Sequence, residues 1–376
     1  MKRNKKLVEK TVLNTFQEEI PSIYFSDKTK AEYSAFKNNA EYVYRELFNF
    51  PKEMFKDKDV LDFGGGTGEQ TVYLTNWGAR MTHVEMNHLA IKIAKSVFKK
   101  YGSSFTKHRF VNTSIFDFKI AKKFDIVHSR GVFSHTYDKK KAFDKLAGFL
   151  KPGGYLIFGD PNKIGGFQNM LQRYIVYTLG KDRDHMEEIC ETLFKDDITR
   201  SVKSRAVRTR RSIIFDRWII EQQDDPSVEE VLSWFKKNNL RFYSSYPKFI
   251  FPFLSNSVYS RKSFDIRNLS KYSVLAEALW MIKNTEDNQD YEEYLSSINK
   301  IHDQQNKLSN YLSAISPDSK ISISSSIKMV DSYKKSIKNI DIAKPISKRL
   351  TTFLNEVDGL LKILKSNNLM KVKNYL

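Results

Sequence analysis

The sequence predicts an α/β fold, with a mostly parallel sheet and helices on both of its faces. Between residues 58 and 162, short apolar segments alternate with longer amphipathic ones, and glycine or proline marks many of the boundaries. Strands that alternate with helices of this length are typical of βαβ units, whose strands run parallel. A glycine-rich stretch, "DFGGGTGEQT", directly follows the first apolar segment.

The alternating region is divided as follows. The predicted strands, the third with its following turn, are residues 59–63, 79–87, 108–118, 123–135 and 155–162. The predicted helices are residues 68–78, 88–102 and 139–151. Gly78 and Gly102 end the first two helices, and Pro152 with two glycines ends the third.

The flanking regions read as helical. Tyr33, Phe36, Ala40, Val43 and Leu47 recur at three- and four-residue intervals in the N-terminal region, which is typical of an amphipathic helix. After residue 162 the alternation breaks, and helical stretches with a basic run predict an insertion over residues 163–225, above the carboxyl ends of the strands. A further helix and strand are predicted over residues 227–249, and only helices from about residue 270 onward.

The composition predicts a globular, strongly basic protein. Hydrophobic residues make up 40% of the 376 residues and aromatic residues 13%, enough for a sizeable core. The 63 Lys and Arg against 44 Asp and Glu give a net charge of +19. This charge indicates a nucleic-acid or anionic-membrane partner, or it reflects a lysine-rich composition with lysines scattered over solvated faces; the sequence leaves both open.

Several features bear on location and metals. No apolar run approaches the ~18 residues that a membrane span needs, and no signal-peptide core follows the basic start. Cys190, the one cysteine, excludes an intramolecular disulfide and a cysteine-cluster metal site. The seven histidines are scattered without metal-ligand spacing. We therefore expect a cytoplasmic protein without a metal cofactor.

The glycine-rich stretch is the strongest functional signal. Asp62, Gly64, Gly66 and Gly68 form the pattern D-x-G-x-G-x-G, and the dinucleotide pattern G-x-G-x-x-G would place its third glycine on Glu69. Glycines after a strand let a ligand approach the backbone. Acidic residues on both sides of them repel a pyrophosphate and suit a ligand that carries positive charge. A tight turn without a ligand is the alternative.

With Glu85 in "THVEMN" and with the "LKPGGYLIF" turn, this loop resembles the class I S-adenosylmethionine-dependent methyltransferases. The resemblance covers residues 58–162 well and extends more loosely to about 265. It implies a Rossmann-like, seven-stranded, mostly parallel sheet. It also implies a division into an N-terminal helical lid (1–57), a cofactor-binding methyltransferase domain (58–265) with a substrate-covering insertion (163–225), and a C-terminal helical region (266–376).

The resemblance implies roles for several residues in binding S-adenosylmethionine. Asp62 would lie near the methionine end, Glu85 would bind both ribose hydroxyls, and Met86 would pack on the adenine. Family members often place an acid after the third strand for the adenine amino group, whereas this chain has Ser114 followed by Ile115 there, with Asp117 three residues late. The implied cofactor-binding residues are Asp62, Gly64, Gly66, Gly68, Glu85, Met86, Ser114, Ile115 and Ser129.

The loop "GVFSHT" after the fourth strand resembles the "GVLHH" loop of small-molecule methyltransferases, whereas the Asn/Asp-Pro-Pro-aromatic motif of base-amine methyltransferases is missing. His135 is the candidate general base, because imidazole titrates near neutrality; a loop-packing histidine is the alternative. His128 is expected to be structural. Two roles are open for Asp160 and Asn162. Either they orient the reacting group, with Asp160 as a catalytic residue, or they cap the next helix.

The insertion is expected to set substrate specificity. Asp216, Arg217 and Trp218, ahead of the "EVLSWF" helix, resemble substrate contacts of some metabolite methyltransferases. Arginines in the basic run either hold a phosphate or carboxylate or form a solvated helix face. They are Arg205, Arg208, Arg210 and Arg211.

These observations predict a methyltransferase that transfers a methyl group to oxygen or nitrogen of a small metabolite, and an anionic metabolite is one of the alternatives. Two alternatives stay open. One is an RNA methyltransferase that uses the basic surface, and the other is a cofactor-binding scaffold without catalysis. The C-terminal helices are the candidate surface for an oligomer or a protein partner.

Overall fold

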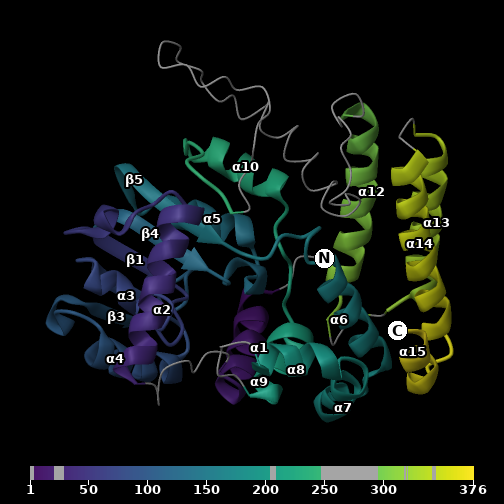
Figure 1. Cartoon of the computed structure of the whole chain (residues 1–376), viewed down its shortest axis with the longest axis horizontal. Helices are drawn as coiled ribbons and strands as arrows, with labels where there is room; N and C mark the ends of the chain where they lie inside the picture. The colour runs from purple at the N-terminus through teal and green to yellow at the C-terminus, as the bar shows by residue number, and fades with distance from the viewer. Residues whose placement is uncertain are drawn as a thin grey trace. The chain divides into compact units, whose positions relative to one another are not determined.

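The computed structural model describes residues 4–20, 29–203, 209–246, 295–316, 319, 321–340 and 344–376, which form two compact units (Figure 1). The first unit takes its residues from 1–160, 196–216 and 237–249, and the second takes the remainder. The division into lid, methyltransferase domain and C-terminal region stays a prediction.

The first unit is built on five parallel strands in the order β3-β2-β1-β4-β5, which confirms the α/β fold with a parallel sheet. The strands are β1 (Asp59–Phe63), β2 (Arg80–Glu85), β3 (Arg109–Asn112), β4 (Phe124–Arg130) and β5 (Leu150–Gly159). The seven strands that the resemblance implies are not all found: residues 241–246, predicted as part of a sixth strand, form none, and residues 247–265 lie outside the described ranges.

Helices and single turns connect these strands. They are α1 (Lys5–Glu18), α2 (Lys30–Tyr42), η1 (Val43–Leu47), η2 (Lys52–Phe55), α3 (Val72–Asn76), α4 (His88–Tyr101), η3 (Phe105–Lys107), η4 (Phe133–His135) and α5 (Lys139–Ala147). The helical segments α8 (Lys195–Lys203) and α9 (Arg210–Ile214) belong mostly to this unit. The helix predicted after the first strand is shorter than expected, because the glycine turn occupies residues 64–71 and α3 begins only at Val72.

The fifth strand also begins earlier than predicted. Phe124 pairs with Leu150 and Ile126 pairs with Tyr155, so residues 151–154 form a β-bulge within β5. Gly153 adopts a φ of +76°, which glycine tolerates without strain. The "KPGG" segment therefore lies inside the strand and does not precede it.

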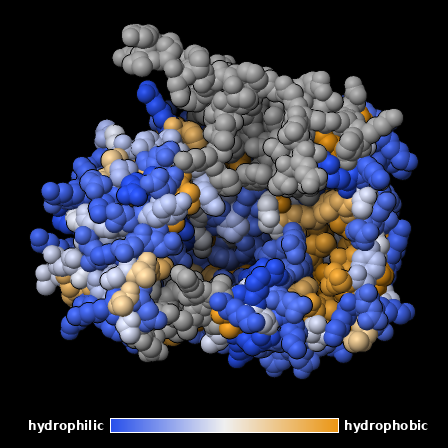
Figure 2. All heavy atoms as spheres, in the orientation of Figure 1, coloured by the Kyte–Doolittle hydropathy of each residue, from blue (hydrophilic) through white to orange (hydrophobic). Residues whose placement is uncertain are grey.

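Helices pack on both faces of the sheet, as predicted. Val60, Met81 and Ile126 lie on one face and share an apolar core with α2, α3 and α4, in which Tyr44, Trp77 and Phe98 are buried. On the other face, Phe158 contacts Phe143 of α5. Hydrophilic side chains cover most of the visible surface of this unit (Figure 2).

The second unit is helical where it is described. Its helices are α6 (Phe167–Leu179), α7 (Arg183–Leu193), most of α10 (Val228–Lys237), α12 (Leu295–Ser313), α13 (Ile323–Lys338), α14 (Lys344–Leu364) and α15 (Leu369–Tyr375). Helix α12 packs against α6 and α13, and α13 packs against α14. A hydrogen bond of 2.7 Å between the hydroxyls of Tyr174 and Ser326 links α6 to α13. Among the described residues, no helix is both long and apolar enough to cross a membrane.

One buried carboxylate joins the three central strands of the sheet. Asp62 on β1 is the register partner of His83 on β2 and of His128 on β4. Its Oδ1 lies 2.8 Å from Nδ1 of His128, and its Oδ2 accepts from the Thr71 hydroxyl at 2.8 Å and lies 3.2 Å from Nδ1 of His83. Burial alone would raise the pKa of Asp62, but the hydrogen bond from His128 and the nearby His83 imidazole outweigh burial and hold the pKa well below its usual range.

The same carboxylate favours the charged form of His83. Burial alone would lower the pKa of the His83 imidazole, but the Asp62 carboxylate, whose Oδ2 lies 3.2 Å from Nδ1, raises the pKa above the ordinary value of 6.5. Nε2 of His83 also lies 3.1 Å from the carbonyl oxygen of Gly66. Acceptors near both ring nitrogens suit an imidazolium, which carries two N–H donors.

This arrangement predicts a pH dependence of stability. A histidine with a raised pKa stabilises the folded state fully below its unfolded pKa, and this stability is lost as the pH rises through the folded pKa. We expect the free energy of unfolding of the wild type to fall, relative to His83→Gln, as the pH rises above about 6.5. Urea unfolding at several pH values measures the difference.

His108 serves as a control for which stability should change with pH in the opposite direction, because burial lowers the pKa of its imidazole. Relative to His108→Gln, the wild type should gain stability as the pH rises toward 6.5. If the free energies of unfolding of the wild type and of His83→Gln changed with pH in parallel, this result would contradict a charged His83 beside Asp62.

Candidate functional site

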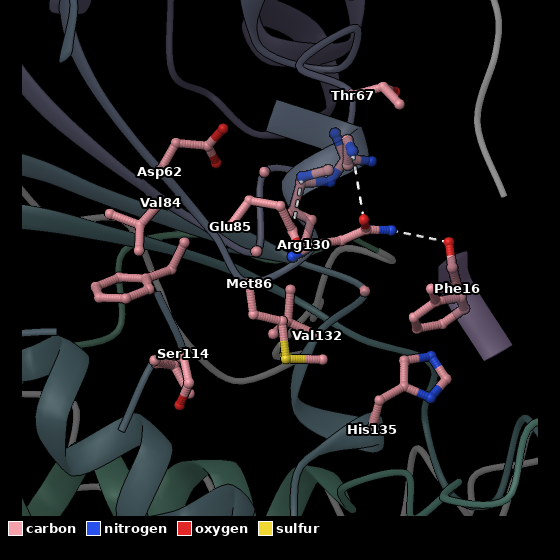
Figure 3. A pocket seen from close by; sticks show the side chains of 18 of the residues that line it. Phe16, Asp62, Thr67, Val84, Glu85, Met86, Ser114, Arg130, Val132 and His135 are labelled. Atoms are coloured by element: carbon pink, nitrogen blue, oxygen red, sulfur yellow. Dashed lines mark hydrogen bonds between the residues drawn. The ribbon is translucent and has the colours of Figure 1, made fainter. Parts of the chain in front are cut away.

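A cavity of about 320 Å³ lies at the carboxyl ends of β1, β2 and β4, where parallel sheets bind ligands (Figure 3). All of the residues that line it belong to the first unit. They come from α1 and Ile20, from the end of β1 and the glycine turn, from the end of β2 and the start of α4, from residues 113–116, from residues 128–136 and from Asp216.

The glycine turn forms one wall of the cavity. Gly66 has a φ of +55°, and the direction that a Cβ would take is open space. Gly64 also lines the cavity, whereas Gly68 does not; a Cβ on Gly68 would lie 2.7 Å from the Phe98 ring. Gly66 therefore exposes backbone to the cavity, and Gly68 serves the packing of α4.

Glu85, at the end of β2, closes the turn from the other side. Its Oε2 accepts from the Gly66 N–H at 3.0 Å, and its Oε1 accepts from the Asn87 N–H at 2.8 Å. Burial raises the pKa of Glu85 above its ordinary value. The hydrogen bonds from the backbone lower this pKa, but burial outweighs them. A carboxylate has about four lone-pair sites, so these hydrogen bonds do not exhaust its capacity to accept.

The cavity is acidic although the chain is basic. Its described lining carries five carboxylates, against one permanent positive charge on Arg130; the acids are Glu9, Asp62, Glu69, Glu85 and Asp216. Such a lining favours a cationic ligand. Among the residues that the structure describes, no three His, Cys, Asp or Glu side chains gather closely enough to hold a metal ion.

Helix α1 forms a further wall. Glu9, Val12, Phe16 and Ile20 from this region line the cavity. The Phe16 carbonyl accepts from the Asn87 side chain at 2.8 Å, and Glu9 Oε1 accepts from the Ser114 hydroxyl at 2.5 Å. The helix is thus held against the ends of β2 and β3.

His135 lines the cavity beside Phe16 (Figure 3). The two rings meet edge to face, with centroids 5.3 Å apart. The turn that carries His135 is held by Asp160, whose carboxylate accepts from the backbone N–H groups of Phe133 (3.2 Å) and Ser134 (3.3 Å) and from the Ser134 hydroxyl (2.9 Å). These contacts indicate that Asp160 positions the His135 turn.

The structure brings most of the predicted cofactor residues together. Those that line the cavity are Asp62, Gly64, Gly66, Glu85, Met86, Ser114 and Ile115, along with His135 and Asp216 from the other predicted roles. Ser129 is buried, and its hydroxyl donates to the Phe63 carbonyl at 3.1 Å, which ties β4 to β1. His128, expected to be structural, is bonded to Asp62 as described above and also borders the cavity.

Three predicted substrate residues belong to the second unit. Trp218 is fully buried, its indole N–H donates to Gln172 at 3.0 Å, and its ring packs against Phe194. The guanidinium of Arg217 lies over the Trp218 ring, and the side chain of Asn162 accepts from the Gly165 N–H at 2.8 Å, ahead of α6. Their roles toward a substrate stay predictions.

The basic run is only partly described. Arg205 and Arg208 lie outside the described residues. Arg210 donates to Thr199 at 3.3 Å, and Arg211 pairs with Glu18 at 2.9 Å and lies over the Phe215 ring. The two described arginines thus contact groups of the protein itself.

Sequence reasoning missed several lining residues. Arg130 stands at the end of the predicted fourth strand, and Asn87 lies two residues after the predicted ribose acid, Glu85, so the sequence carried a signal for both. Glu9 and Phe16 gave no such signal. The hydrophobic pattern of a sequence can predict an amphipathic helix, but it does not predict that the helix contacts residues about a hundred positions later in the chain.

Comparisons with known proteins agree with this geometry. Residues 36–193 match a family model described as a methyltransferase domain. A ubiquinone biosynthesis O-methyltransferase of Coxiella burnetii is 30% identical over 112 residues, which cover 29% of this chain and 45% of that protein. A malonyl-[acyl-carrier protein] O-methyltransferase of Ilyobacter polytropus is 31% identical over 102 residues, 27% of this chain and 38% of that protein.

The chain thus spans less than half the length of these curated relatives. A solved S-adenosylmethionine-dependent methyltransferase of Clostridium acetobutylicum is 25% identical and covers 39% of this chain and 56% of that one, at a TM-score of 0.29, which supports no further argument. The family match, the parallel sheet and the glycine turn agree that residues 36–193 form a methyltransferase domain, and they support the resemblance to the class I methyltransferases, whose cofactor is S-adenosylmethionine.

Proposed function

We propose that the protein transfers a methyl group from S-adenosylmethionine to oxygen or nitrogen of a small metabolite. The observation that carries the proposal is the acidic cavity in which Glu85 faces the glycine turn and His135 borders the same space. The names of the curated relatives, both O-methyltransferases, favour oxygen as the acceptor.

The residues of this chain would bind the cofactor along the strand ends. The bare backbone at Gly66 lets a ligand approach, and Glu85 can accept from two ribose hydroxyls with its remaining lone pairs. Met86, Ile115 and Phe116 offer apolar surface for the base. The acidic lining would stabilise the positive charge of the bound ligand.

Bound S-adenosylmethionine would supply an electrophilic methyl group. The sulfur would leave as a neutral thioether that keeps the electrons of the broken carbon–sulfur bond, and Gly66 and Glu85 would hold the rest of the cofactor. His135 would accept the proton that a hydroxyl acceptor loses. Phe16 packs beside the His135 ring, and Asp160 positions its turn, so the base is held in place.

Helix α1 would act as part of a lid that excludes water from this reaction. Asp216 lines the cavity and is the proposed substrate contact in the first unit. A small, neutral or cationic acceptor suits five carboxylates better than an anionic one does.

Binding of S-adenosylhomocysteine tests the cofactor site. We expect the wild type to bind and Glu85→Ala to bind at least about tenfold more weakly, because the ribose hydroxyls lose a charged acceptor. Isothermal titration calorimetry measures both. Glu53→Ala removes an exposed carboxylate of the same unit and should bind as the wild type does; no binding by a folded wild type would refute the proposal.

Turnover tests the proposed base. With labelled S-adenosylmethionine and a panel of phenols, catechols and amines, His135→Gln should lower kcat by about 10²- to 10⁴-fold for a hydroxyl acceptor. The affinity for S-adenosylhomocysteine should change little, since His135 faces the acceptor side. Equal kcat values for the two proteins would exclude His135 as the base.

A further inference from the structure

We propose that Glu9 of α1 recognises the amino group of the cofactor's adenine, and so selects that base. This inference rests on the proposed function, because it assigns a residue to the same cofactor. It gives the N-terminal helix a direct part in ligand recognition, beyond covering the cavity.

The first observation is the position of Glu9. Its carboxylate lines the cavity and accepts from the Ser114 hydroxyl at 2.5 Å. Its Oε2 lies 3.8 Å from the Lys5 ammonium, and the side chain is 23% exposed, so the carboxylate is held by the protein and still lines the cavity. A salt bridge between Lys5 and Asp117, with atoms 2.6 Å apart, holds the start of the same helix to the same segment.

The order of the strands gives the direction in which the ligand runs. The glycine turn follows β1, Glu85 ends β2, and Ser114 follows β3, and these strands are neighbours in that order. A ligand with its sulfonium at the turn and its ribose at Glu85 therefore places its base above the end of β3. Glu9 stands there together with Ser114.

The chemistry at that end suits an aminopurine. Val12, Met86, Ile115 and Phe116 give the cavity apolar surface for a flat ring. Glu9 adds a carboxylate, which accepts a hydrogen bond from an amino group and repels the carbonyl oxygen of a 6-oxopurine. The positions after β3 where an acid is expected carry Ser114 and Ile115. Glu9, from a helix 105 residues before Ser114, brings a carboxylate to this place.

A purely structural role of Glu9 is the competing explanation. In that case the carboxylate only fastens α1 to Ser114, and its loss would weaken every ligand of the cavity equally. Base recognition predicts a loss confined to ligands that carry the amino group. Two ligands that differ only in this group separate the explanations.

The experiment compares S-adenosylhomocysteine with its analogue in which hydrogen replaces the 6-amino group, by calorimetric titration. We expect the wild type to prefer the amino form by about tenfold or more. Glu9→Ala should abolish this preference by weakening the amino form alone, and Glu9→Gln, which keeps an acceptor oxygen, should retain part of it. Ser114→Ala should keep most of the preference, because it leaves the carboxylate in place.

Glu18→Ala is the matched control, because it removes a carboxylate of the same helix that is bonded to Arg211 and does not line the cavity. It should keep the preference of the wild type. Equal weakening of both ligands in Glu9→Ala, or a wild type that binds both ligands equally, would overturn the role of Glu9 and leave the cofactor site intact. A wild type that binds neither ligand would overturn the proposed function itself.

Discussion

The site depends on the buried carboxylate of Asp62, which three neighbouring strands share. An unpaired carboxylate at this depth would be costly, and donors from His128, Thr71 and His83 offset that cost. The resulting cluster also dictates the turn that follows. A Cβ on Gly65 would lie 2.2 Å from the His83 ring and 2.5 Å from Asp62 Oδ2, so only glycine fits between them.

This arrangement changes the role expected for Asp62. The resemblance implies a residue near the methionine end of the cofactor, and Asp62 does border the cavity. Both of its oxygens, however, are engaged by protein groups, and the residue is 1% exposed. In the proposed function, Asp62 would therefore contribute a nearby negative charge on a rigid support, while Glu85 and the backbone of Gly66 would make the contacts with the ligand.

Net charge and local charge disagree in this protein, and the local charge decides the site. The chain carries +19, yet the described lining of the cavity holds five acids and one arginine. Charges beyond about 8–10 Å are screened at physiological salt, so scattered surface lysines affect the cavity little. The composition therefore predicted little about the charge of the cavity, whereas Asp62 and Glu69, on either side of the glycines, indicated its acidic lining.

The sequence predicts those features of the fold that depend on residues close together in the chain, and it misses those that depend on distant residues. Strand β1 matches its predicted bounds, because "DVLDF" is an apolar run with a glycine turn at its end. The short α3 and the bulge in β5 were missed, because glycines at positive φ prolong a turn or interrupt a strand without changing the hydrophobic pattern. The contact between Asp160 and the His135 turn joins residues about 25 apart through one side chain, and no periodicity reports such a contact.

Helix α1 shows how far the site depends on distant contacts. A helix of 14 residues is marginal in water by itself, so its stability must come from packing. Val8 and Val12 are buried, and polar contacts reach Asp117, Ser114, Asn87 and Arg211. Because Glu9, Val12 and Phe16 are also cavity walls, formation of the helix and completion of the cavity are one event. A ligand that binds these walls must then stabilise the helix by mass action, even though α1 lies outside the segment that matches the methyltransferase family.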